Sequence, residues 1–259
     1  MMKKTKVTER NWVNYFAANR TRRLSIDWTN GVAISAKERE AITGSLQRFQ
    51  VGESGEGKYL KKYAAQTGDA EYVQAIDLFI AEENYHAQLL AHVLDALKAP
   101  LLQGHWSDAA FIVLRRFGGL HAELMILLVA ELIAKRYYRV LQNATQDENI
   151  RLMCAQILRD ENAHVAFHCD TLSRAFAYYS TSRRAWTLLS WKSFYRFVCF
   201  VVACDHRKVL FAANVSIMDW MRSTNDVFDQ AAHSIFDVTQ KATSQHRVGQ
   251  SLQEGKKYF

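Results

Sequence analysis

The sequence predicts an all-α protein built on an antiparallel four-helix bundle, and three observations lead to that prediction. The chain of 259 residues contains one proline and 11 glycines, too few breakers for many short strands. Apolar residues recur at helical spacing in four long segments. Two connections between these segments share the turn pattern Thr-x-Asp, at Thr67–Asp69 and at Thr145–Asp147.

Cap, turn and proline signals set the boundaries of the helices. Ser35 with Glu38 three residues later is a capping-box pattern that starts a long helix. Pro100 ends the next helix, and Ser107 is a good N-cap for the one after it. We expect helices over 8–19, 35–66, 70–98, 107–143 and 149–179.

These signals divide the chain into four parts. Two or three further helices are expected after the bundle, and the sequence from Ser244 onward is polar. The parts are an N-terminal helix and lead-in (1–34), the four-helix bundle (35–180), extra helices packed on it (181–243) and a polar tail (244–259).

The motif Glu-x-x-His occurs twice within these helices. Each copy is preceded, 30 residues earlier, by another glutamate, and the second set lies 78 positions after the first. Residues three apart share one face of a helix, so each motif presents a carboxylate and an imidazole together. The two sets are Glu53, Glu83, His86 and Glu131, Glu161, His164.

The turns predict how the two sets are placed in space. Gly68 lies midway between the glutamates of the first set, and Gln146 midway between those of the second. A hairpin that reverses at its midpoint brings its ends to one height, after arms of about 15 residues or roughly 22 Å. Two such hairpins packed face to face form a bundle with a pseudo-twofold axis. The six side chains then meet in its core.

Apolar residues flank each of these acids at helical spacing, as Ile76, Phe79 and Ile80 do before Glu83. A buried carboxylate without a partner is disfavoured and takes up a proton. The stripes offer too few lysines or arginines to compensate four acids, whereas two metal ions would supply the charge. Mixed carboxylate and imidazole ligation suits iron or manganese. The competing interpretation is exposed glutamates with hydrogen-bonded core histidines.

This pattern resembles the ferritin-like di-iron carboxylate superfamily, which includes ferritins, rubrerythrins, ribonucleotide reductase small subunits and di-iron oxygenases. The superfamily has Glu, Glu-x-x-His, Glu, Glu-x-x-His on four consecutive helices, and the six residues match it position by position over about residues 35–180. The resemblance implies a ferritin-like bundle with additional C-terminal helices. It also implies two iron ions, with manganese as the alternative, and no catalytic residues beyond the metal ligands.

The same resemblance implies a second layer of acids behind the histidines. Asp160 would contact His86, and Glu82 would contact His164. A carboxylate on the distal imidazole nitrogen fixes the tautomer and raises the basicity of the ligand. The alternative is that both acids are exposed.

Two further residues are left open as ligands. Glu56 lies one turn beyond Glu53 and is the alternative ligand from the first long helix. His168 continues the stripe of His164, either as a core histidine or as a third histidine ligand.

Three glycines, Gly52, Gly55 and Gly57, cluster around Glu53 inside the first long helix. Each costs roughly 1 kcal/mol relative to alanine in a helix. We expect that the glycines allow a close approach of backbones, a local bulge, or room beside the metal ions.

The resemblance implies a di-iron oxidoreductase, of the monooxygenase type, that oxidises an organic substrate with dioxygen. Its electrons would come from an external donor such as a reductase or ferredoxin. The helices after residue 183 favour this function over a ferroxidase or iron-handling protein. The sequence is also compatible with a tRNA-directed di-iron hydroxylase and with a helical interaction protein that has a structural metal site.

Composition bounds the partners and the compartment. The net charge of +7 indicates solvated helix ends or an anionic partner such as RNA or a membrane surface, and no RNP-like motif supports nucleic acid. Four cysteines without C-x-x-C spacing are expected as buried free thiols in a reducing compartment.

The most apolar stretch, 197–204, is too short to span a bilayer, so we expect a cytoplasmic protein without a transmembrane segment. Aromatic residues over 186–200 are expected in the core, with a substrate tunnel or a homodimer face as alternatives.

Overall fold

The computed structural model describes residues 2–55, 57–104 and 119–254, and in these ranges the chain forms helices and no strand. The prediction of an all-α protein is therefore confirmed for the described residues. The helices are α1 (Met2–Asn19), α2 (Ala36–Glu53), α3 (Lys58–Ala65), α4 (Ala70–Ala96), α6 (Gly119–Ala144), α7 (Glu148–Phe176), α8 (Thr181–Asp205), α9 (Arg207–Ala212) and α10 (Ile217–Glu254).

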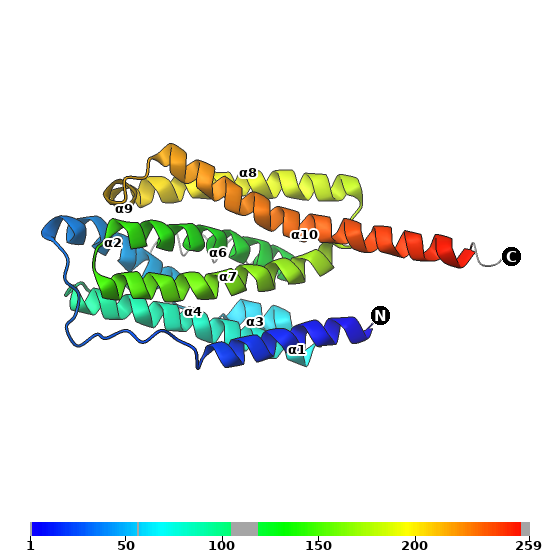
Figure 1. The fold of residues 1–259 in the computed structure, drawn as a ribbon, viewed down its shortest axis with the longest axis horizontal. Coiled ribbons are helices and arrows are strands. Elements are labelled where there is room, and N and C mark those ends of the chain that lie inside the picture. Colours follow the sequence, from blue (N-terminus) through cyan, green and yellow to red (C-terminus); the bar gives the residue numbers. More distant parts are fainter. Residues whose placement is uncertain (1, 56, 105–118, 255–259) are drawn as a thin grey trace.

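The long helices lie side by side in layers (Figure 1). α6 packs on α7, α2 packs on α4, and α4 also contacts α7. α1 and α3 cover α4 on one side, while α8, α9 and α10 lie over α6 and α7 on the other. Fully buried side chains between the layers, such as Leu46, Phe79, Tyr137 and Phe167, form one continuous core. This core fixes the helix faces that carry the acidic residues.

The two Thr-x-Asp turns are built in the same way. The Thr67 hydroxyl accepts a hydrogen bond from the backbone N–H of Asp69, and the Thr145 hydroxyl accepts one from that of Asp147. Each aspartate is the N-cap of the next helix, α4 or α7, and accepts backbone N–H groups of its first turn. The predicted turns thus reverse the chain between α3 and α4 and between α6 and α7.

Other helix boundaries agree with the sequence signals in part. The capping box of Ser35 and Glu38 is present at the start of α2. α4 and α7 end within one turn of the predicted positions. The predicted start of a helix near Ser107 lies outside the described residues. α10 continues to Glu254, so the backbone is helical where the sequence predicts a polar tail from Ser244.

The first long helix is interrupted, and the prediction of one helix over 35–66 is wrong. α2 ends at Glu53 and α3 begins at Lys58. Gly57 has a φ of 58°, a left-handed conformation that glycine adopts without steric cost. A Cβ at Gly57 would overlap Cδ1 and Cγ1 of Ile80, and the Asn84 amide donates to the carbonyl of Gly55 at 3.0 Å. Gly57 therefore allows a close approach of this break to α4, whereas a Cβ at Gly52 would meet no atom within 4 Å.

α8 has two different faces, so the expectation that aromatic residues of 186–200 lie in the core holds for one face only. Trp191 and Tyr195 are buried, whereas Trp186, Phe197 and Phe200 are exposed. Among the described helices, α8 alone is long and apolar enough to cross a membrane by length and composition. The apolar stretch 197–204 is one end of this helix.

The cysteines are free thiols, as the sequence predicts. Cys154, Cys169 and Cys199 are buried, and Cys204 is half-buried.

The close approach at Gly57 can be tested with Gly68, which has a similar φ of 69° but no atom within 4 Å of the position that a Cβ would occupy. We expect Gly68→Ala to lower the free energy of unfolding by about 1–2 kcal/mol, the cost of a left-handed alanine. Gly57→Ala should lose about 1–3 kcal/mol more, because its methyl group is forced into Ile80. Denaturant unfolding measures both. Equal losses for the two variants would contradict the close approach, and Ile80→Ala should relieve the excess in Gly57→Ala.

Candidate metal centre

The structure brings all six predicted ligand residues together between four helices. Glu53 is the last residue of α2, and Glu131 lies on α6. α4 and α7 each contribute one Glu-x-x-His motif. The two histidines are fully buried, three of the glutamates are buried, and Glu83 has a side chain that is 20% exposed. The competing interpretation of exposed glutamates is therefore wrong.

His86 directs its Nδ1 atom toward three carboxylates. Nδ1 lies 3.8 Å from Oε2 of Glu53, 3.7 Å from Oε1 of Glu83 and 3.6 Å from Oε1 of Glu161. These three acids come from three different helices. The nitrogen is buried and makes no hydrogen bond.

His164 repeats this arrangement around the other upstream glutamate. Its Nδ1 atom lies 2.9 Å from Oε1 of Glu83, 3.5 Å from Oε2 of Glu131 and 3.9 Å from Oε2 of Glu161. Glu83 and Glu161 thus face both imidazoles, whereas Glu53 and Glu131 each face one. The two rings are 5.5 Å apart between centroids.

Ligating atoms of Glu83, His86, Glu161 and His164 all lie within 4.8 Å of one another, so this group can hold a metal ion. Several buried polar atoms of the six residues lack a hydrogen bond, among them one carboxylate oxygen each of Glu83, Glu131 and Glu161 and the Nδ1 atoms of both histidines. Buried polar atoms in folded proteins are normally satisfied. A cation among them would satisfy these atoms, and the donor set of oxygen and nitrogen fits a metal ion.

The acids behind the histidines make the contacts that the resemblance implies. Nε2 of His86 lies 3.2 Å from Oδ2 of Asp160, and Nε2 of His164 lies 3.0 Å from Oε2 of Glu82. Both acids are buried. An N–H donated at Nε2 leaves the lone pair of each imidazole on Nδ1, the atom that faces the glutamates.

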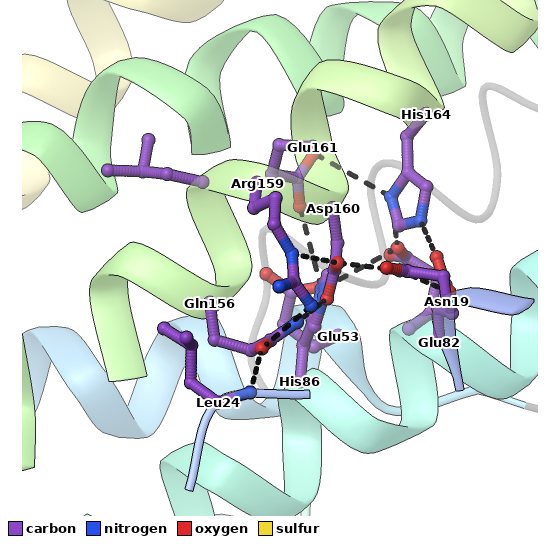
Figure 2. Close-up of polar contacts among 12 residues, drawn as sticks. Asn19, Leu24, Glu53, Glu82, His86, Gln156, Arg159, Asp160, Glu161 and His164 are labelled. Atoms are coloured by element: carbon purple, nitrogen blue, oxygen red, sulfur yellow. Dashed lines mark hydrogen bonds and ion pairs between the residues drawn. The ribbon is translucent and has the colours of Figure 1, made fainter. Parts of the chain in front are cut away.

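Three supporting residues were not identified from the sequence. The Asn19 amide donates to Oε1 of Glu82 at 2.7 Å and to Oδ1 of Asp160 at 2.8 Å, so one side chain joins the two acids (Figure 2). Gln156 donates to Oδ2 of Asp160 at 2.7 Å, and the Tyr138 hydroxyl donates to Oε1 of Glu53 at 2.6 Å. Gln156 lies four residues before Asp160, a spacing that could have revealed it. The Asn19 contacts are long-range and leave no such signal.

The two residues left open as ligands have different outcomes. Glu56 lies outside the described residues. His168 is fully buried, with Nε2 4.0 Å from Oε1 of Glu131 and no hydrogen bond at either ring nitrogen. Burial lowers the pKa of His168 to about 4, so its imidazole is neutral at pH 7. His168 borders the group of four without belonging to it.

Electrostatics in the metal-free centre favour bound protons. Burial, together with the charges of Glu131 and Glu53, raises the pKa of Glu83 to about 8. Burial opposes a charge on His86, but its hydrogen bond to Asp160 and the nearby carboxylates of Glu53 and Glu83 raise its pKa to about 10. Both groups therefore hold a proton at pH 7.

A cavity of about 180 Å³ adjoins the acids. All four ligand glutamates line it, and its other walls come from α2, α6 and α8. Those walls are mainly apolar, with Phe49, Leu127 and Val202 among the lining residues. Arg48 lies in the wall as well, and its Nε atom forms an ion pair with Asp205 at 2.8 Å.

Comparison with protein-family models, curated proteins and solved structures finds no match to this chain. The function of the centre must therefore be inferred from the residues that form it.

Removing a shared carboxylate tests whether the centre binds metal. Because Glu83 faces both imidazoles, we expect Glu83→Ala to lose at least one metal ion per chain. Elemental analysis of protein produced with iron and manganese in excess gives the number of metal ions per chain. The matched control is Asp95→Ala, which removes an exposed acid from the same helix and should leave the content unchanged. A wild-type metal content in Glu83→Ala would contradict the assignment.

Metal uptake should release protons. At pH 7 metal-free protein carries protons on Glu83 and His86, whose pKa values are about 8 and about 10, and ligands must lose them to bind a cation. Affinity for a divalent ion should therefore rise from pH 6 to pH 8. Calorimetric titration with cobalt in buffers of different ionisation enthalpy counts the released protons. Uptake that releases none would show that other groups bind the metal.

Proposed function

We propose that this chain is a di-iron carboxylate oxidoreductase with a ferritin-like bundle, in which two iron ions, or manganese in their place, act with dioxygen on an organic substrate. The observation that carries the proposal is the apolar cavity lined by all four candidate ligand glutamates. A metal centre that opens onto apolar space is suited to an organic molecule, whereas iron storage requires a polar path for cations.

The contacts divide the ligands between two positions. Glu53 and His86 would hold one ion, and Glu131 and His164 the other. Glu83 and Glu161, which face both imidazoles, would serve both ions. Four carboxylates then balance the charge of two divalent ions, which explains how so many acids can be buried together.

Two iron ions, when bound, would supply electrons for the reduction of dioxygen, and the residues of this chain would hold and orient the ligands. Asp160 and Glu82 hold the Nε2 protons and orient both imidazoles. Tyr138 holds one oxygen of Glu53, which leaves its second oxygen toward His86. The apolar part of the cavity wall would contact the substrate beside the ligand glutamates. Repeated turnover requires fresh electrons, which we assign to an external donor such as a reductase or ferredoxin.

The size of the cavity limits the substrate. An apolar protein cavity of about 150 Å³ is large enough to bind benzene. The cavity here, at about 180 Å³, accommodates an apolar group of similar size. Small aromatic and cyclic hydrocarbons are therefore suitable probes.

Gly52 provides the test because it lines the cavity and a Cβ there meets no atom within 4 Å. Reduced, iron-loaded protein should transfer oxygen from ¹⁸O₂ to toluene or cyclohexane, detected by mass spectrometry. We expect Gly52→Leu to lower product yield at least tenfold with unchanged iron content, because its side chain would obstruct the exposed edge of the cavity. Gly44→Leu, on the same helix outside the cavity, is the control. Oxidation of ferrous iron at equal rates in all three proteins, without product, would favour iron handling instead.

A further inference from the structure

The outer side of α8 carries an apolar stripe that the described part of the protein does not cover. Trp186, Leu189, Phe197 and Phe200 are 72%, 59%, 66% and 52% exposed. Their spacing places them on one face of the helix. We call these four residues the α8 stripe. Exposed apolar patches of this kind mark interaction sites.

The opposite face of α8 fixes the helix along the surface of the protein. Trp191 and Tyr195 both pack on Phe228 of α10, with ring centroids 5.0 and 4.8 Å apart. The Trp191 indole also donates to the carbonyl of Met125 on α6 at 3.1 Å. α8 therefore packs on α10 and α6 along one face and presents its stripe outward.

The serine hydroxyls within the stripe are hydrogen-bonded inside the helix and do not depend on solvent. Ser190 and Ser193 are exposed and lie between the apolar side chains. Their hydroxyls donate to backbone carbonyls of α8, Ser190 to Trp186 at 2.8 Å and Ser193 to Leu189 at 2.8 Å. Such internal bonds let serine enter an apolar medium without an unsatisfied donor.

Basic side chains border the stripe, although Lys192 is paired with Asp229 and Lys208 with Glu40. Residues 181–212 contain six basic side chains and one acidic side chain, Asp205, in a protein whose net charge is +7. Arg183 and Arg196 are exposed and lie at the two edges of the stripe by helical spacing. Neither forms an ion pair with a described residue. An apolar, aromatic face with basic edges is the pattern of a helix that lies in the interface of an anionic membrane.

We propose that the α8 stripe docks onto an anionic lipid surface, with Trp186, Phe197 and Phe200 in the interfacial layer. Arg183 and Arg196 contact the lipid phosphates. A second copy of the chain fits this face less well, because a twofold contact would bring the basic edges of two α8 helices together. The stripe and its arginines are separate from the ligand residues, so the docking proposal does not rest on the metal chemistry proposed above.

Flotation of the full chain with lipid vesicles tests the proposal. We expect binding to vesicles of phosphatidylcholine with about 30% phosphatidylglycerol to be at least tenfold stronger than to phosphatidylcholine alone, and to weaken as salt is raised. Equal binding to both vesicles, or binding to neither, would overturn the proposal.

Matched variants separate the stripe from other exposed apolar residues. Leu189→Ser and Leu101→Ser make the same change at side chains of similar exposure, 59% and 51%, inside and outside the stripe. We expect Leu189→Ser to weaken vesicle binding several-fold. The double variant Phe197→Ser/Phe200→Ser should weaken it about tenfold or more, and Leu101→Ser should have no effect. Circular dichroism confirms that each variant is folded. Equal loss in Leu101→Ser would overturn the proposal.

Charge-matched variants test the basic edges. Arg183→Glu/Arg196→Glu should weaken binding to the anionic vesicles at least tenfold, because each basic residue near such a surface contributes about 1 kcal/mol. Arg20→Glu/Arg22→Glu makes the same change in net charge at exposed positions after α1 and should retain most of the binding. Equal loss in both double variants would assign the effect to net charge and overturn docking by α8. A further outcome would also overturn docking onto lipid: the protein runs as a dimer on gel filtration, Phe197→Ser/Phe200→Ser dissociates the dimer, and the protein does not bind vesicles. This face would then be an interface between two copies of the chain.

Discussion

The burial of carboxylates beside histidines is the constraint on which the rest of this structure depends. Glu53, Glu131 and Glu161 are at most 8% exposed, and the ion pairs of these acids among the described residues are with histidine, never with lysine or arginine. Such a cluster is costly unless protons or a cation compensate it. The matched turns, the break after α2 and the acids behind the imidazoles all serve to hold these groups at one height.

Much of this arrangement could be predicted because it follows from spacing along helices. The positions of Glu83 and Glu161 relative to the Thr-x-Asp turns determine where the two motifs meet, and the structure places them together. The break at Gly57 was predicted only in part: the glycine cluster indicated a bulge or a close approach, but the apolar pattern continues through it and predicted an unbroken helix. Gly57 lies at the break in a left-handed conformation, and a Cβ there would overlap Ile80, a long-range relation that no local pattern records. Asn19 was missed for the same reason, since its partners are 63 and 141 residues away.

α8 links the candidate centre to the outside of the protein. Val201 and Val202 line the cavity from one side of the helix, while Phe197 and Phe200 project from its outer side. The same helix is thus a wall of the apolar space beside the acids and the surface most suited to a lipid interface. Movement of α8 would change both at once, and the packing of Trp191 and Tyr195 on Phe228 limits that movement.

Asn19 has a consequence for how the two halves of the centre fill. Its single amide group donates to Glu82 and to Asp160, and these acids hold His164 and His86. A cation that shifts the imidazole of His86 would therefore shift Asp160, and through the Asn19 amide it would also shift Glu82, which contacts His164. If two ions bind as proposed, the two positions would not be independent, and occupancy of one would prepare the other. Binding should be cooperative, with a coupling free energy that passes through one asparagine at the end of α1.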